Sequence, residues 1–121
     1  MSTMSDAEKR YLRALERLGT SHPVCVACGE DDPRCLEAHH IAGRAFDDQT
    51  VLVCRNCHRK LSDAQRDHAG KIGNPPSLLE TLAHYLLGLG DILHLVADRL
   101  KQFAKELLAM IKAEKAKGGS S

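Results

Sequence analysis

Two pairs of cysteines, Cys25–Cys28 and Cys54–Cys57, have the spacing of a metal-binding site. Structural zinc is held by four ligands in a tetrahedron, and two cysteines separated by two residues clamp one side of the ion. We therefore predict that these four cysteines bind a structural Zn²⁺, which would stabilise a domain whose own core is small. The remaining cysteine, Cys35, is predicted to be a small buried residue of a strand rather than a ligand.

Three histidines lie close to these cysteines in the sequence. His39 and His40 are adjacent between the two pairs, and His58 follows the second pair directly. If the adjacent histidines lie on a strand, their rings point to opposite faces, so one could bind a metal while the other faces a water molecule. The zinc would hold the helix start that carries His58 against the strand that carries His39. Such rigid placement is what a catalytic metal site requires.

The elements that must position these residues follow from turn signals and apolar patterns. Ser5 and Glu8 have the spacing of a capping box, and Gly19 marks a helix end, which predicts an N-terminal helix. Gly29 is expected to allow the tight turn of the first cysteine pair. The following segments are predicted as strand, loop, strand and helix, which together form a ββα unit: 35–41, 42–49, 50–53 and 57–68.

The segment 71–76 contains Gly-Asn-Pro-Pro and is the clearest linker. After it, Ser77 and Glu80 form a second capping box. Apolar residues then alternate at steps of three and four, as in a coiled-coil seam, at positions 79, 82, 86, 89, 93, 96, 100, 103, 107 and 110. Small residues flank the seam at Ala83, Gly90, Ala97 and Ala104.

A helix of about 39 residues would span roughly 58 Å, longer than the preceding segment could cover. It must either pair with a second chain or fold back as a helical hairpin at Gly88-Leu89-Gly90. The unbroken register favours one continuous helix, and we predict a homodimer formed through it. The end of the chain, 112–121, is expected to be a basic and then Gly/Ser-rich frayed tail.

The composition narrows the choice of compartment and partner. Paired cysteines with one left over are typical of a reducing compartment, and the polar N-terminus predicts no signal peptide, so we expect a cytoplasmic protein. Charged and polar residues interrupt the apolar stretch 78–96, so we predict no membrane span there. The predicted organisation is an N-terminal helix (1–20), a core (21–71), a linker (72–77), a helical region (78–117) and a tail (118–121).

The runs Glu37–Arg44 and Val51–His58 together resemble the HNH endonucleases that contain an embedded zinc ribbon. This resemblance implies an α+β fold with a ββα-metal core and zinc-ribbon knuckles, and an enzyme that hydrolyses DNA phosphodiester bonds. It further implies that His39 and His58 bind a divalent catalytic metal and that His40 is the general base. Imidazole takes up a proton near neutral pH and binds Mn²⁺, Co²⁺ or Ni²⁺ better than Mg²⁺. We therefore expect activity with Mn²⁺ at least as high as with Mg²⁺.

The chain departs from the family pattern in one place. The family's middle asparagine, which orients the general base, is missing, since no asparagine occurs in 41–53. Phe46 or Gln49 occupies this region, and the side chain of Gln49, Asp47 or Asp48, or a backbone carbonyl, could replace the asparagine.

The net charge of +1 gives no general attraction to DNA, so contacts must come from a local basic surface. Candidate phosphate-binding residues surround the motif: Arg44, Arg55, Arg59, Lys60 and Arg66. The regularly spaced arginines of the N-terminal helix, Arg10, Arg13 and Arg17, are interpreted as a solvated face. The other histidines, His22, His68, His84 and His94, are interpreted as structural. The alternatives to a nuclease are a zinc ribbon that binds nucleic acid or protein without cleavage, and an interaction protein whose working part is the C-terminal helix.

Overall fold

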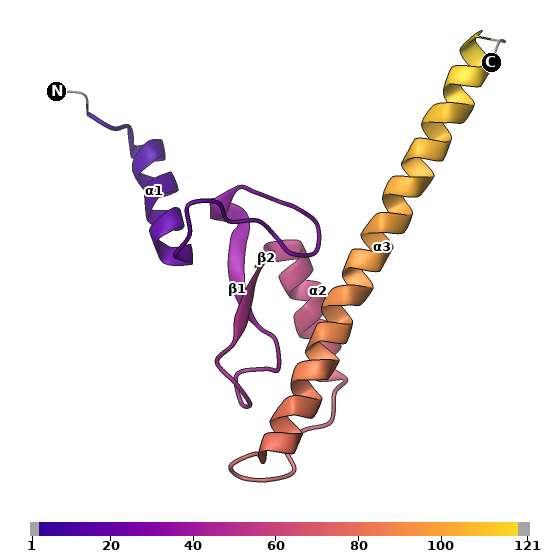
Figure 1. Ribbon diagram of the computed structural model, residues 1–121. Coiled ribbons are helices and arrows are strands. Elements are labelled where there is room, and N and C mark those ends of the chain that lie inside the picture. Colours follow the sequence, from indigo (N-terminus) through magenta and orange to yellow (C-terminus); the bar gives the residue numbers. More distant parts are fainter. Residues whose placement is uncertain (1–2, 119–121) are drawn as a thin grey trace.

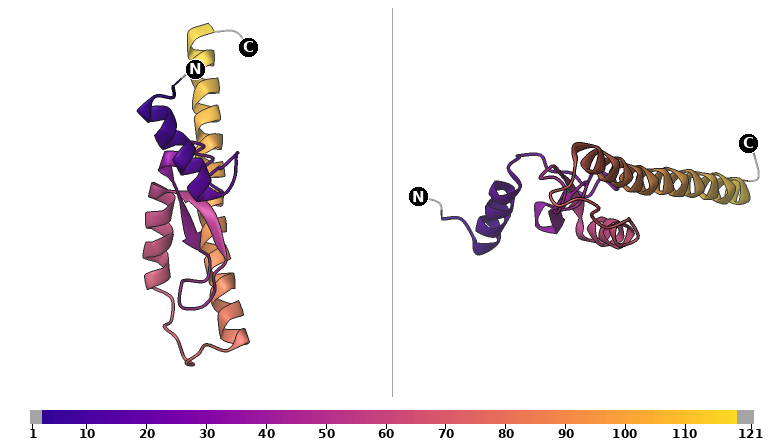
Figure 2. Two further views of the ribbon diagram at one scale, coloured as in Figure 1. Left: turned by 90° about the vertical axis from the view of Figure 1, so that its left-hand side faces the viewer. Right: turned by 90° about the horizontal axis from the view of Figure 1, so that it is seen from below.

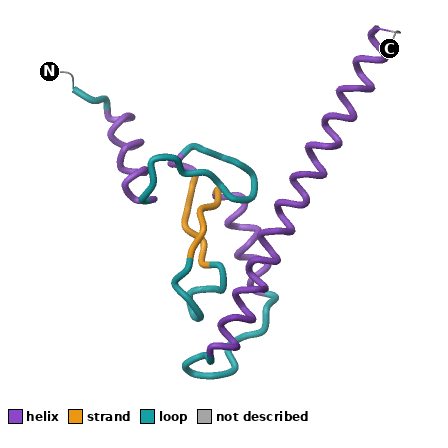
Figure 3. Tube along the Cα trace, in the orientation of Figure 1, coloured by secondary structure: helices purple, strands orange, loops and turns teal. Residues whose placement is uncertain are grey.

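The computed structural model describes residues 3–118 and shows a small α+β protein with a long C-terminal helix. Two strands form one antiparallel sheet, and three α-helices surround or extend from it (Figure 1). In chain order the elements are α1 (Asp6–Leu18), a 3₁₀ turn η1 (Pro33–Cys35), β1 (Leu36–His40), β2 (Thr50–Cys54), α2 (Arg55–Arg66) and α3 (Leu78–Gly118). The order strand, loop, strand, helix is the predicted ββα arrangement, and Figure 3 shows the loop that joins the two strands at one end of the sheet.

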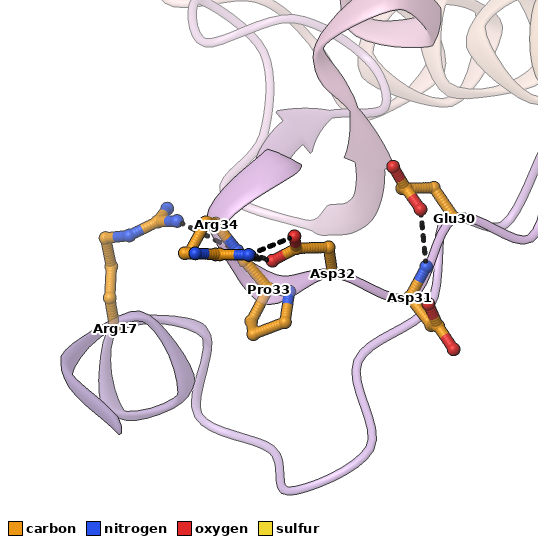
Figure 4. Close-up of polar contacts among 6 residues, drawn as sticks. All are labelled: Arg17, Glu30, Asp31, Asp32, Pro33 and Arg34. Atoms are coloured by element: carbon orange, nitrogen blue, oxygen red, sulfur yellow. Dashed lines mark hydrogen bonds and ion pairs between the residues drawn. The ribbon is translucent and has the colours of Figure 1, made fainter. Parts of the chain in front are cut away.

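Helix α1 begins and ends as its capping residues predict. The Ser5 hydroxyl accepts a hydrogen bond from the Glu8 N–H at 3.1 Å, and Gly19 ends the helix with a φ of 73°. Arg17 departs from the prediction of a solvated face, because its guanidinium donates to the carbonyl of Leu36 at 2.9 Å and to that of Pro33. Figure 4 shows Arg17 pointing from α1 toward η1. Arg17 therefore fastens α1 to the start of β1.

Strand β1 is shorter than predicted, because the turn η1 takes its first residue. The Asp32 carboxylate accepts a hydrogen bond from the Arg34 N–H at 3.0 Å and also pairs with the Arg34 guanidinium (Figure 4). Pro33, at the start of the turn, has the fixed φ that a helical turn needs. Cys35 consequently lies in η1 and is only half-buried, so the prediction of a buried strand residue was wrong.

The sheet register places the chemistry-bearing residues at its two ends. Leu36 pairs with Cys54, and His39 pairs with Val51. Leu36 and Val53 are fully buried, and with Leu61 of α2 and Ile92 of α3 they form the centre of the core. Since side chains alternate along a strand, the residues of β1 that share a face with His39 are those two positions away.

Helix α2 starts two residues earlier than predicted, at Arg55. Cys54 acts as its N-cap, because its sulfur accepts a hydrogen bond from the Cys57 N–H at 3.4 Å. The start of α3 follows the predicted capping box in part: the Ser77 hydroxyl accepts from the Glu80 N–H at 3.1 Å. The Glu80 carboxylate accepts hydrogen bonds from the Ile72 N–H and, at 3.0 Å, from the Gly73 N–H of the linker. These two hydrogen bonds lower the pKa of the Glu80 carboxyl.

Helix α3 is one continuous helix of 41 residues, so it does not fold back at its glycines. Its first half packs on the body through His84, Gly88 and Ile92, which lie on one face at intervals of four residues and are all buried. Gly88 makes this approach possible, since a Cβ atom there would lie only 1.8 Å from the carbonyl oxygen of Ile41. The glycine that suggested a break therefore serves a close contact between α3 and the end of the sheet.

The second half of α3 extends beyond the body formed by the sheet, α2 and the connecting loops, and every residue from 97 to 118 is exposed. Figures 1 and 2 show the helix extending well past the sheet and α2. The predicted seam is split: Leu89 and Val96 pack against the core, whereas most other seam residues are exposed. Within residues 3–118, no helix combines the length and the apolar character that crossing a membrane would need. Of the predicted frayed tail 112–121, residues 112–118 belong to α3, so the prediction was wrong for them, and residues 119–121 lie outside those described.

Candidate metal centre and histidine cluster

The four paired cysteines come together in space as their spacing predicts. The sulfur atoms of Cys25, Cys28, Cys54 and Cys57 all lie within 4.8 Å of one another, and three of the four residues are buried. Four soft ligands at this separation are compatible with a structural metal such as zinc. Cys35 is not part of the cluster. In the part of the chain that the structure describes, this is the one group of three or more metal-ligating side chains that converge in this way.

Backbone hydrogen bonds build the first half of this centre. The Gly29 N–H donates to the Cys25 carbonyl at 3.0 Å, and Gly29 has a φ of 84°, which a residue with a side chain rarely adopts. The Cys25 N–H donates to Glu30, and the Val26 N–H donates to the Leu52 carbonyl of β2 at 3.0 Å. The knuckle 25–30 is thus tied to the strand that carries Cys54.

Burial and neighbouring sulfurs shift the pKa values of three of the four cysteines. Burial opposes thiolate formation at Cys25, but the backbone amides of Cys54, Ala27 and Cys28 outweigh it and lower the pKa of Cys25 to about 7. Burial raises the pKa of Cys28 and strongly raises that of Cys57, and neighbouring sulfurs add to both effects. Thiolates at Cys28 and Cys57 are therefore disfavoured without positive charge nearby. A divalent metal bound by the four sulfurs would supply that charge and would join the knuckle to α2.

The structure also brings His39 and His58 together. Their ring centroids lie 5.3 Å apart, with an angle of 71° between the ring planes. His39 is only 2% exposed. Burial, followed by the nearby His58 and His40, lowers the pKa of His39 to about 4. His39 is therefore neutral near pH 7, which is the form in which an imidazole binds a metal.

His40, the predicted general base, lies at the end of β1 and is half-buried. Strand alternation turns its ring to the face opposite that of His39. Its backbone carbonyl is bound by two donors, the Gly43 N–H and the side chain of Gln65. The backbone at His40 is thus held in place, while its ring lies on a different side of the strand from the His39–His58 pair.

Glu37 is a site residue that the sequence analysis missed. Its Oε2 lies 2.6 Å from Nδ1 of His58, and its Oε1 lies 3.4 Å from Nε of Arg55. A carboxylate that accepts a hydrogen bond from one ring nitrogen of a histidine fixes the ring and leaves the other nitrogen for a metal. Glu37 stands two residues before His39, so strand alternation alone could have placed both on the face of β1 that meets α2.

Gln65 of α2 was missed as well. Its side-chain nitrogen donates to the carbonyls of His40 at 2.9 Å and Ile41 at 3.2 Å, and it lies 3.4 Å from Nε2 of His39. An amide from α2 thus holds the end of β1. Phe46, in the loop between the strands, stacks on the ring of His84 at 3.8 Å and therefore has a packing function. Gln49 contributes its backbone carbonyl, which accepts from the Ile41 N–H.

A surface cavity of about 800 Å³ adjoins the Glu37–His58 pair. It is lined by Glu37, Arg55, Asn56, His58, Arg59, Ser62, Asp63 and Arg66. Three of the five predicted phosphate-binding residues therefore share one cavity with His58. Lys60 instead faces α3 and the cysteine centre, and Arg44 lies in the loop near His84. His39 and His40 do not belong to the lining of this cavity.

The remaining histidines of the C-terminal half contact α3 or its neighbours. Nε2 of His68 lies 3.0 Å from the Asp91 carboxylate, which links the end of α2 to α3. His84 is buried and stacked on Phe46, and the exposed His94 lies 3.4 Å from Asp98 one turn further on. These contacts agree with a structural role. His22 is exposed, and its backbone N–H donates to the Thr20 hydroxyl.

Comparison with known proteins identifies no family or function for this chain. Neither a protein-family model, nor a curated protein, nor a solved structure matches the chain. The function must therefore be argued from the cysteine centre, the histidine pair and the basic cavity themselves.

Proposed function

We propose that the chain is a metal-dependent endonuclease of the HNH type, which hydrolyses DNA phosphodiester bonds and contains a structural zinc. One observation carries the proposal: the cysteine centre joins the knuckle to the first turn of α2, and His58 of that turn lies 5.3 Å from His39 of β1. A zinc ribbon that only binds its partner has no need of paired imidazoles beside the metal centre. The basic cavity next to His58 supplies a place for the phosphate backbone.

The residues fit a catalytic divalent cation. His39 and His58 would hold it, because His39 is neutral and Glu37 fixes the ring of His58 through Nδ1. When bound, such a cation stabilises negative charge on the phosphate and on the leaving oxygen. Two nitrogen ligands favour Mn²⁺, Co²⁺ or Ni²⁺ over Mg²⁺.

The side chains of this chain account for the proton and the phosphate. His40 takes a proton from a water molecule, and the water oxygen forms a bond to phosphorus while the bond from phosphorus to the 3′ oxygen breaks. The 3′ oxygen then takes up a proton from solvent water. The products carry a 5′ phosphate and a 3′ hydroxyl. Arg55, Arg59 and Arg66 hold the phosphate backbone in the cavity. Gln65 acts as a positioning residue, because its amide holds the backbone of His40.

A second candidate function rests on a specific observation. His39 and His40 do not line the basic cavity, so DNA could occupy the cavity without meeting the general base. In that case the chain is a zinc-containing module that grips nucleic acid through Arg55, Arg59 and Arg66 and does not cleave it. The two functions agree on binding and differ only in cleavage.

Nicking of a supercoiled plasmid distinguishes the two functions. Wild type, His40→Ala and the control His94→Ala are compared with Mn²⁺ present, and DNA binding is followed in parallel by gel shift without Mn²⁺. We expect nicking by wild type and His94→Ala, and a loss of at least about 100-fold in His40→Ala with unchanged DNA binding, since general-base catalysis contributes 10²–10⁴-fold. Binding without nicking by wild type, or equal nicking by His40→Ala, would contradict the nuclease proposal. Sequencing the ends checks for the 5′ phosphate.

A further inference from the structure

Helix α3 has two apolar faces, and only one of them is used within the chain. The face with His84, Gly88 and Ile92 is buried against the body. On the other side lie five leucines spaced seven residues apart, and all are exposed at 59–77%: Leu79, Leu86, Leu93, Leu100 and Leu107. We call these five residues the leucine stripe. The body lies along one side of α3 (Figure 2), and the exposed fractions of the five leucines show that the leucine stripe is open along its whole length.

The residues three and four positions after each leucine of the stripe are apolar, and two of them, Leu89 and Val96, also pack against the core. The positions three residues after each leucine are Leu82, Leu89, Val96, Phe103 and Met110, and those four residues after are Ala83, Gly90, Ala97, Ala104 and Ile111. A period of seven residues maintained in this way is the pattern of helices that wind around each other. A helix lying on a flat surface would instead follow the period of 3.6 residues.

Gly90, in the interior of α3, points to a partner that is missing from the single chain. Glycine in a helix interior costs about 1 kcal/mol relative to alanine. At Gly88 the body requires it, since a Cβ would lie 1.8 Å from the Ile41 carbonyl oxygen. At Gly90, beside the leucine stripe, a Cβ would meet nothing within 4 Å. The small residues at 83, 90, 97 and 104 thus have no role in packing the body, whereas they would let a second helix approach closely.

We infer that the leucine stripe binds the leucine stripe of a second copy of this chain, so that two α3 helices pair and the two bodies lie on the outer sides. A second copy is favoured because a stripe made of one residue type at a constant period of seven complements itself. From Leu79 to Ile111 the paired surface would be about 50 Å long. With a helix about 10 Å wide, this gives roughly 500 Å² from each chain, which reaches the total of about 1,000 Å² that a specific interface needs.

The inference is independent of the nuclease proposal, and its test uses the full-length, zinc-loaded chain. Light scattering after size exclusion gives the mass of wild type, of Leu93→Glu/Leu100→Glu, and of the control Ala109→Glu, whose position is exposed and lies off the stripe. We expect wild type and the control to have twice the chain mass of 13.3 kDa. The double variant should fall to 13.3 kDa, with a dimer dissociation constant raised at least about 100-fold, because two charges per chain would be buried. Both leucines are more than 60% exposed, so the charges should not unfold the monomer, and circular dichroism checks this.

Three results would overturn the inference. A monomeric wild type at micromolar concentration would show that the stripe does not bind a second copy. A control variant that dissociates as readily as the stripe variant would place the contact elsewhere on α3. A monomer that cosediments with vesicles of phosphatidylcholine and phosphatidylglycerol would assign the stripe to a lipid surface instead.

Discussion

The contact between α3 and the end of β1 makes a prediction whose size follows from the geometry. Replacing Gly88 with alanine puts a methyl group 1.8 Å from the carbonyl oxygen of Ile41 and 2.7 Å from its carbonyl carbon. Real Cβ atoms essentially never approach a neighbour closer than 3.0 Å, so the backbones must separate by more than an ångström. Neither partner is the flexible end of a side chain. The helix itself must therefore move.

The cost of this movement can be estimated from known effects. Overpacking a close contact costs about 1–3 kcal/mol. Moving α3 outward also partly exposes Ile92, which is buried in the native structure. Full burial of such a side chain contributes about 1.5–3 kcal/mol, and we expect about half of this free energy to be lost. Alanine returns about 1 kcal/mol through its higher helix propensity. The net expectation for Gly88→Ala is a loss of about 2 kcal/mol, a large part of the stability of a small domain.

Urea unfolding provides the assay, and Gly90→Ala provides the matched control. The chain has two tyrosines and no tryptophan, and Tyr85 packs against the core, so tyrosine fluorescence reports the docking of α3 while circular dichroism reports the helix. Within the single chain a Cβ at Gly90 meets nothing, so Gly90→Ala should make the monomer more stable than the wild-type monomer by about 0.5–1 kcal/mol. Each variant is measured at two protein concentrations, which separates folding from self-association. A Gly88→Ala variant as stable as wild type would refute the argument that α3 rests on Ile41.

Three further predictions concern the metals and the basic cavity. Cys54→Ser should lose the bound zinc and most of its cooperative unfolding, whereas Cys35→Ser should retain one zinc per chain by metal analysis, because Cys35 lies outside the cluster. Nicking with Mn²⁺ should be at least as fast as with Mg²⁺, and activity confined to Mg²⁺ would argue against two histidine ligands. Arg59→Ala/Arg66→Ala should weaken DNA binding about tenfold or more at low salt and reduce its salt dependence, while Lys60→Ala, which faces away from the cavity, should have a smaller effect in the same titration.

The parts of the structure that sequence patterns predicted are those fixed by local rules. The Ser5 cap and the Gly19 end of α1 depend on residues within one helical turn. The approach of Cys25 and Cys28 depends on a turn that the hydrogen bond from Gly29 to Cys25 closes. The spacing of two residues between the cysteines is typical of such a turn. The convergence of the two pairs is the arrangement that one structural metal with four ligands would require. Local sequence was sufficient wherever the physical cause lay within a few residues.

The parts that were not predicted depend on contacts between distant segments. Gln65 binds the carbonyl of His40 across 25 residues, and no spacing rule connects them. Glu37 and His58 are 21 residues apart and meet only because the ββα arrangement brings β1 beside α2. The role of Gly88 was likewise hidden, because a glycine that breaks a helix and one that admits a neighbouring backbone look the same in a sequence.

Helix α3 shows why an apolar period predicts burial without identifying what covers it. A single seam from Leu79 to Met110 fitted the sequence, yet the body covers Leu89 and Val96 of this seam and leaves the leucines at every seventh position open. The same helix therefore has a buried face and an open apolar face about half a turn apart. On the buried face, Gly88 lies against the backbone of Ile41, the residue after His40. The position of α3 therefore affects the backbone next to His40. If the leucine stripe pairs two chains, dimerisation fixes a helix that already supports the backbone beside the proposed general base, and the two bodies are held in a defined relation on either side of the paired helices.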